Sequence, residues 1–164
     1  MKIELKDIGR VRSAFRKPED LHFACEKGVM VDTESEIIIN DEFSECLKGL
    51  DSFSHLWIIY LLHEADRIEL ETHPGPPKIE DLPKVGVFAS RSQYRPNHIA
   101  LRLVRLEKVG LGNLLVKGLD AIDNTPVLDI KPFVPHFDRA DGERIARWYE
   151  WGKSGSTSKE EVSE

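Results

Sequence analysis

The chain has 164 residues, of which 40% are hydrophobic, and its formal net charge at pH 7 is -6. This length suits one domain with a substantial core, and the acidic balance argues against a general nucleic-acid binder, because phosphate contacts require clustered lysine and arginine. Two cysteines without Cys-x-x-Cys spacing, Cys25 and Cys46, indicate neither a disulfide framework nor a zinc site.

The longest apolar run, residues 56–62, is far shorter than the roughly 20 residues that cross a bilayer. At the N-terminus, charged and apolar side chains alternate instead of forming the apolar segment of a signal peptide. We therefore expect a soluble cytoplasmic protein that has no membrane partner.

The first predicted strand covers residues 2–11, where apolar and polar side chains alternate. Residues 12–31 lack a regular pattern: Pro18 and its charged neighbours indicate a turn, and residues 21–30 fit either a loop or a short strand. A run of β-branched residues predicts the next strand at residues 36–39.

The apolar period then changes to that of a helix. Phe43, Leu47 and Leu50 have the spacing i, i+4 and i+7. Asn40 can cap such a helix and Gly49 can end it. The pattern predicts one short amphipathic helix.

Residues 54–63 are apolar on both faces, which predicts a central strand covered on both sides. A buried helix is the alternative, but the aromatic and β-branched residues favour the strand. Farther along, residues 67–70 can extend a strand, and the proline-rich residues 73–77 predict a rigid exposed loop.

Residues 86–101 form a polar loop between two apolar segments, and they contain Arg91 and Arg95. Guanidinium groups stay charged and are costly to bury without a partner. Pro96 and Asn97 restrict the backbone, so we expect the loop to have one shape. Such a loop can present donors to a carboxylate, a phosphate or a ribose. Pairing of the arginines with nearby acids is the structural alternative.

A strand follows in which Ile99, Leu101 and Leu103 are expected to face inward, with a shift of phase around Val104 and Leu106 that is typical of a bulge. The glycines near residue 111 then predict a hairpin turn.

The last predicted strand covers residues 126–133. Alternation places Val127, Asp129 and Lys131 on one face, with the two charged residues about 7 Å apart. A structural ion pair is one interpretation of Asp129 and Lys131. The other is a pocket acid that the lysine keeps ionised.

Residues 144–151 have the pattern of a helix, and residues 153–164 form a polar tail that we expect to be disordered. Several short strands with little helix predict an all-β barrel or sandwich, and no alternation typical of a Rossmann fold is present. The predicted domain covers residues 1–152.

No metal site or nucleophilic hydrolase is expected. Residues 63–67 begin like the zinc motif His-Glu-x-x-His, but Arg67 stands where the second histidine is required. No serine or cysteine occupies a Gly-x-Ser-x-Gly turn.

Three stretches, residues 50–57, 86–101 and 118–133, together resemble the TrmO/TsaA-like family. In bacteria these are S-adenosylmethionine-dependent methyltransferases that act on N6 of threonylcarbamoyl-modified adenosine 37 of tRNA. The resemblance implies a mainly β fold, a small closed or partly open β-barrel with one or two short helices and a C-terminal helix. It also implies tRNA as a partner and a homodimer with the cofactor site near the subunit interface.

Carried onto this chain, the resemblance implies a set of residues around S-adenosylmethionine. These are His63, Glu64, Arg91, Arg95, Asn97, Leu101, Asp120, Ala121, Ile122 and Asp123. For catalysis we predict that Asp129 accepts the proton of the target amine and that Lys131 keeps Asp129 charged or contacts the substrate.

Several positions depart from the family pattern. His98 and Ala100 stand where proline and glycine are common, Asn124 replaces glycine, and Phe133 replaces tyrosine. The family's Pro-Arg-Gln element is not recognisable in residues 21–30. With the low net charge, these departures leave an alternative, a non-catalytic RNA-binding or small-anion-binding β-barrel that retains the cofactor pocket.

Overall fold

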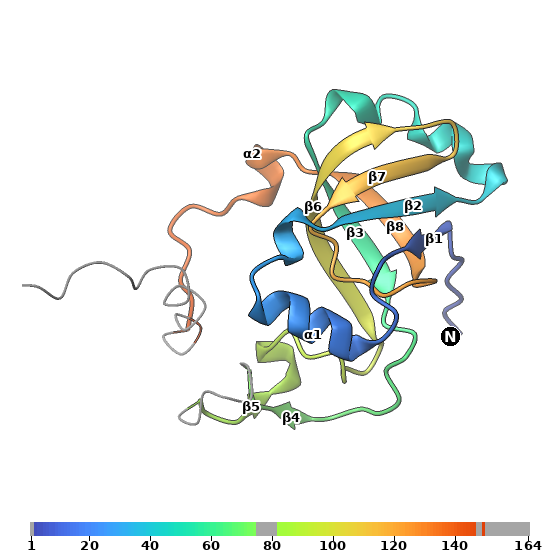
Figure 1. The fold of residues 1–164 in the computed structure, drawn as a ribbon. Coiled ribbons are helices and arrows are strands. Elements are labelled where there is room, and N and C mark those ends of the chain that lie inside the picture. Colours follow the sequence, from blue (N-terminus) through green and yellow to red (C-terminus); the bar gives the residue numbers. More distant parts are fainter. Residues whose placement is uncertain (1, 75–81, 147–148, 150–164) are drawn as a thin grey trace, which may run out of the picture. The chain divides into compact units, whose positions relative to one another are not determined.

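Six antiparallel strands close into a barrel, which confirms the mainly β fold (Figure 1). The computed structural model describes residues 2–74, 82–146 and 149. Around the barrel the strand order is β1-β2-β7-β6-β3-β8. The strands are β1 (Gly9–Arg12), β2 (Glu34–Ile39), β3 (His55–Leu61), β6 (Ile99–Val109), β7 (Asn113–Lys117) and β8 (Pro126–Pro132).

The chain divides into two compact units. One comprises Met1–Ala65 and Asn97–Asp138 and contains the barrel, and the other comprises Asp66–Pro96 and Arg139–Glu164. None of the described helices is long and apolar enough to cross a membrane.

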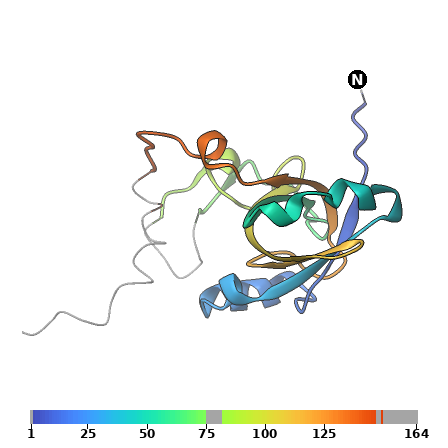
Figure 2. The same ribbon diagram turned by 90° about the horizontal axis from the view of Figure 1, so that it is seen from above.

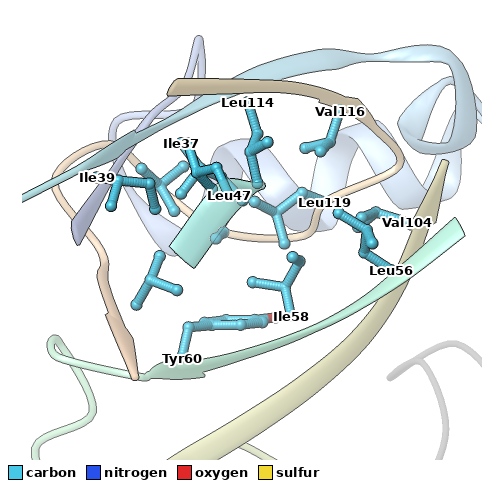
Figure 3. Close-up of a cluster of buried hydrophobic side chains, with 13 residues drawn as sticks. Ile37, Ile39, Leu47, Leu56, Ile58, Tyr60, Val104, Leu114, Val116 and Leu119 are labelled. Carbon is cyan, nitrogen blue, oxygen red and sulfur yellow. The ribbon is translucent and has the colours of Figure 1, made fainter. Parts of the chain in front are cut away.

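The barrel core is built from side chains that point inward from every strand (Figure 3). The alternation of β3 is the clearest, because Leu56, Ile58 and Tyr60 are buried while the residues between them are only partly covered. Leu119, which follows β7, also enters this core. The predicted central strand is confirmed, although its outer face is only half-buried.

The first structural correction concerns the N-terminal segment. Only Gly9–Arg12 forms a strand. Ile8 before it packs against the barrel core, but Ile3 and Leu5 are exposed, so the alternation in residues 2–5 does not reflect burial against a core.

The second correction is a helix, α1 (Pro18–Glu26), where a turn followed by a loop or a short strand was predicted. Pro18 occupies the first turn, where its missing N–H costs nothing. The Asp20 carboxylate accepts the N–H groups of Arg16 and Lys17 at 2.8 and 3.2 Å. Residues 17–20 therefore start a helix, and acids in its first turn suit the helix dipole.

The amphipathic segment after β2 is helical, as predicted, but with 3₁₀ geometry. It forms η2 (Asp41–Leu47) and η3 (Leu50–Ser52), and Gly49 between them has φ +87°. Leu47 is buried in the barrel core. In Figures 1 and 2, η2 and η3 (teal) lie at the opposite end of the barrel from α1. A third short element, η1 (Met30–Asp32), follows α1.

The predicted phase of β6 is wrong. Leu101 and Leu103 pair with Ile59 and Trp57, which face outward from β3, whereas Val104 pairs with the buried Leu56. The even-numbered residues of β6 up to Leu106 therefore face the core. The expected bulge is confirmed at 106–108, where β6 pairs with β7. The predicted hairpin between these strands is confirmed.

The strand β8 is confirmed, but its side chains do not alternate regularly between the inner and outer faces of the barrel. Its register shifts against Ile59 and Tyr60 of β3, so that Val127 is fully buried. Asp129 and Lys131 pair with outward-facing residues of β3. The bulge thus separates Val127 from the two charged residues. A short helix, α2 (Pro135–Asp138), follows.

The second unit contains β4 (Glu71–Thr72), β5 (Val85–Gly86) and η4 (Val87–Ala89). Residues 67–70 form no strand, which corrects that expectation. Most of the predicted loop at 73–77 lies outside the described residues. So do half of the predicted helix at 144–151 and the whole tail at 153–164, and residues 144–146, which are described, are not helical.

Candidate functional site

The mouth of the barrel near α1 contains a hydrogen bond between Tyr60 and Asp120. Tyr60 is 3% exposed and lies at the end of β3. Its hydroxyl donates to Oδ1 of Asp120 at 2.7 Å and lies 3.1 Å from the carbonyl oxygen of Asp120. Gly118, with φ +85°, turns the chain out of β7, and the buried Leu119 anchors the loop in the core. The carboxylate of Asp120 is thereby held at the barrel rim.

Arg102 lies on the inward side of β6, opposite Ile58. A guanidinium at such a position requires partners, because burial of an unpaired charge is costly. Its Nε donates to the carbonyl oxygen of Gly118 at 2.9 Å, and a terminal nitrogen lies 3.7 Å from Oδ2 of Asp120. Sequence reasoning missed both Tyr60 and Arg102. The sequence signal that could have identified them is the alternation of their strands, because each lies on the same face as buried apolar residues of its strand.

The predicted residues Ala121 and Ile122 are buried, each in a different core cluster. Their side chains are thus unavailable to a ligand. Their backbone N–H groups, however, have no acceptor within the described residues. They are free to donate to a ligand.

Asp123 has a structural role in the same loop. Its Oδ1 accepts the N–H of Ser13 at 3.0 Å, and its Oδ2 forms an ion pair with Arg16. The adjoining Asn124 has φ +63°, the left-handed conformation expected where the family has glycine. Asp123 and Asn124 thus join this loop to the segment that leads from β1 into α1.

His63 and Glu64 follow β3 and are exposed. Nδ1 of His63 lies 3.4 Å from Oγ1 of Thr125, at the end of the loop that contains Asp120. The barrel unit therefore brings the end of β3 together with residues 120–125, two of the segments predicted to form the site. The side chain of Leu101 does not join these segments, because it is 43% exposed on the outer face of β6.

A chain reversal connects β6 to the preceding loop at His98. This residue has φ +46°, which a proline ring cannot adopt, and its carbonyl oxygen accepts the N–H of Leu62 at 2.7 Å. The departure from the family's proline thus coincides with a conformation that proline forbids. Asn97 beside it is exposed.

The arginine-containing loop belongs to the second unit. Arg95 donates to the carbonyl oxygens of Ser90 and Ser92 at 3.3 and 3.2 Å, so it fixes the loop by bonds to backbone rather than to acids. Arg91 is exposed and has no acidic partner within the described residues. Its donors are therefore available to an anionic group.

Asp129 and Lys131 form an ion pair of 2.7 Å on the outer face of the barrel. This confirms the pairing, and both side chains remain partly exposed. The hydrogen bond to Asp129 raises the pKa of Lys131, so the lysine stays charged in neutral solution. Trp57, the β3 neighbour of Lys131, makes an edge contact with Phe133.

Cys25 of α1 is electrostatically coupled to the barrel mouth. Partial burial, and secondly the negative charge of Asp120, raise the pKa of its thiol, while Arg102 lowers it. Both cysteines are free thiols.

In the part of the chain that the structure describes, no three His, Cys, Asp or Glu side chains form a group that could hold a metal ion.

The chain is similar to several known proteins. A family model described as the tRNA-methyltransferase O N-terminal domain matches residues 10–139. A probable S-adenosyl-L-methionine-binding protein of Methanothermobacter thermautotrophicus is 41% identical over 139 residues, 84% of this chain and 95% of the relative. The tRNA (adenine(37)-N6)-methyltransferase of Mus musculus is 44% identical over 102 residues, 62% of this chain and 23% of the mouse protein.

Among solved structures, the crystal structure of TrmO from Pseudomonas aeruginosa is similar, with a TM-score of 0.67 and 32% identity. The match covers 88% of this chain and 62% of that chain. The chain thus spans less than a quarter of the mouse relative and less than two thirds of the Pseudomonas protein.

Proposed function

Because this chain belongs to the family of the tRNA-methyltransferase O N-terminal domain, we propose that it binds S-adenosylmethionine and methylates N6 of an adenosine in tRNA. The observation that carries the proposal is the barrel mouth, where Asp120 is held in place beside unused backbone donors. The names of relatives support the same cofactor and reaction.

The residues at the mouth fit the chemistry of this cofactor. Ribose hydroxyls and an ammonium group are donors and require an acceptor, which Oδ2 of Asp120 supplies. Adenine ring nitrogens are acceptors and suit the backbone N–H groups of Ala121 and Ile122. The carboxylate of the cofactor requires a cation, and we assign that role to Arg91. The other proposed binding residues are His63, Glu64, Arg95, Asn97, Leu101 and Asp123.

When bound, S-adenosylmethionine supplies a methyl group activated by a sulfonium. Transfer of this methyl group to the N6 amine would depend chiefly on positioning, which the proposed binding residues would supply. Asp129 accepts the N6 proton, because the lone pair of an exocyclic amine is delocalised and proton removal favours attack. Lys131 holds a positive charge 2.7 Å from the Asp129 carboxylate.

The finer substrate in this proposal is adenosine 37 with a threonylcarbamoyl group. The position agrees with the name of the mouse relative, which is an adenine(37) enzyme. The exposed Lys131 offers a cation to the phosphates or to the carboxylate of the modified base.

We include a homodimer in the proposal. Its support is the partly exposed apolar outer face formed by Trp57 and Ile59 of β3 with Leu101 and Leu103 of β6. This outer face continues to Asp129 and Lys131 on β8. A second copy seated there covers apolar surface and brings the proposed catalytic pair to a subunit interface.

The test is a methylation assay with purified protein. The protein is incubated with isotopically labelled S-adenosylmethionine and tRNA that contains or lacks the threonylcarbamoyl group, and nucleosides are analysed by mass spectrometry. The expected product is an N6-methylated adenosine derivative, formed only with the modified tRNA. Cofactor binding without product on any tRNA supports the non-catalytic barrel instead, and absence of both binding and product overturns the proposal.

A further inference from the structure

We propose that Tyr60 and Arg102 are positioning residues that hold the Asp120 carboxylate so that its Oδ2 faces the bound nucleoside cofactor. This inference rests on the proposed function. Neither residue was among those expected from the family pattern. The ring of Tyr60 is part of the barrel core, but its hydroxyl and the guanidinium of Arg102 are polar groups beside a core that is otherwise apolar.

The first argument is that the two oxygens of the Asp120 carboxylate have different surroundings. Oδ1 of Asp120 accepts the hydroxyl of Tyr60 at 2.7 Å, while Oδ2 has no hydrogen-bond donor within the described residues and lies 3.7 Å from Arg102. The Asp120 side chain is 34% exposed, so one oxygen remains accessible. A carboxylate fixed through one oxygen has fewer orientations to lose when a ligand binds through the other.

The second argument is the backbone of the loop. Arg102 donates to the carbonyl oxygen of Gly118, and Tyr60 lies within hydrogen-bond distance of the carbonyl oxygen of Asp120. These contacts hold the loop on both sides of the buried Leu119. The orientation of the neighbouring N–H groups, those of Ala121 and Ile122, is fixed with it.

The third argument is electrostatic. Arg102 places a positive charge 3.7 Å from Oδ2 of Asp120, at the rim of an apolar core. Both charges act on the thiol of Cys25. Among the described residues, Tyr60, Arg102 and Cys25 interact with Asp120.

The test is binding of S-adenosylhomocysteine to the full chain by isothermal titration calorimetry. Tyr60→Phe removes only the hydroxyl and is expected to weaken binding about tenfold. Arg102→Gln is expected to weaken it similarly. The matched control is Arg105→Gln, which removes an exposed arginine of the same strand that pairs with Glu107, and it is expected to leave affinity within about twofold.

Two further readouts separate positioning from a merely structural role. Amide hydrogen exchange at residues 118–123 of the unliganded protein should accelerate in Tyr60→Phe, while exchange in β2 and β7 stays unchanged. In turnover, KM for the cofactor should rise while kcat at saturating cofactor stays within about twofold.

The outcomes distinguish the two proposals. If the wild type binds S-adenosylhomocysteine and Tyr60→Phe shows the same affinity and the same loop exchange, the inference is overturned and the proposed function is not. A wild type that binds no S-adenosylhomocysteine overturns the proposed function and the inference with it. A variant that loses exchange protection throughout the barrel and binds with wild-type affinity when folded also contradicts the positioning role.

Discussion

Asp123 accepts the backbone N–H of Ser13 at 3.0 Å, across 110 positions of sequence. The Asp123 side chain is only 16% exposed, and it also pairs with Arg16. One carboxylate thus joins the loop after β7 to the segment between β1 and α1. This contact fixes the position of α1 relative to the barrel mouth.

We expect Asp123→Ala to lower the free energy of unfolding by about 2 kcal/mol, because the N–H of Ser13 then lacks its acceptor in a partly buried place. Urea denaturation followed by circular dichroism measures the change. Asp66→Ala, which removes an exposed carboxylate 3.5 Å from Arg67, is the control and should cost less than about 0.5 kcal/mol. Equal stabilities of the two variants would contradict the structural role of Asp123.

Arg91→Ala should weaken binding of S-adenosylhomocysteine by about tenfold or more, because a charge-assisted hydrogen bond to the cofactor carboxylate is lost. Its exposed side chain has no acidic partner within the described residues, so stability should not change. Calorimetric titration gives the affinity. Lys108→Ala, an exposed cation on β6, is the matched control and should bind normally. Reduced RNA affinity with intact cofactor binding would favour the non-catalytic barrel.

Asp129→Asn should reduce kcat by about 100-fold or more while S-adenosylhomocysteine binds with unchanged affinity, because only proton acceptance is removed. Single-turnover methylation of tRNA measures the rate. Glu107→Gln neutralises another partly exposed, ion-paired acid, on β6, and should retain full activity. A normal rate in Asp129→Asn would leave the pair with Lys131 a purely structural role.

The proposed dimer makes Leu103 a sensitive position on the outer face. Leu103→Arg should convert the dimer to a monomer, because it places an unpaired charge among apolar side chains at the interface. Sedimentation velocity measures the mass in solution. Leu111→Arg is the control, since that leucine is fully exposed at the tip of the β6–β7 hairpin and should not affect assembly. A monomeric wild type would rule out the dimer.

Cys25 should show a pH dependence that reports on Asp120. Because burial and Asp120 raise the pKa of the thiol, alkylation by iodoacetamide should begin at higher pH than for a free cysteine. Asp120→Asn removes the negative charge and should move the onset to lower pH. Peptide mass spectrometry follows the rate at Cys25. An unchanged profile in Asp120→Asn would show that the two groups are not coupled.

The sign for stability follows from the same shift. A thiol whose folded-state pKa is raised contributes stability that is fully present below its unfolded pKa and is lost as the pH rises through the folded pKa. The urea concentration at the unfolding midpoint should therefore decrease as the pH rises through the pKa of the Cys25 thiol. In Cys25→Ser the part of this decrease that the thiol causes should be absent.

The elements that local chemistry specifies were predictable from the sequence. The alternation and β-branched content of β2 and β3, the glycines of the β6–β7 hairpin and the helical spacing of Phe43 and Leu47 all appear in the structure. They were predictable because strand propensity and turn chemistry depend on residues that are close together in the sequence.

The helix α1 was missed although its signals were local. Pro18 was taken as a turn residue, yet it stands in the first turn of a helix whose start Asp20 caps. A proline is compatible with both structures, and the sequence between Leu21 and Glu26 has too weak an apolar face to decide between them.

Only the tertiary structure decided the faces of β6 and β8 and the partners of Asp120. A bulge inverts the side-chain pattern of β8, and its position depends on how three strands pair in a closed barrel. Tyr60, Arg102 and Asp120 meet because barrel closure brings β3, β6 and the loop after β7 to one rim. Sequence fixes which side chains can form such bonds, but contacts between distant segments exist only once the strands have closed.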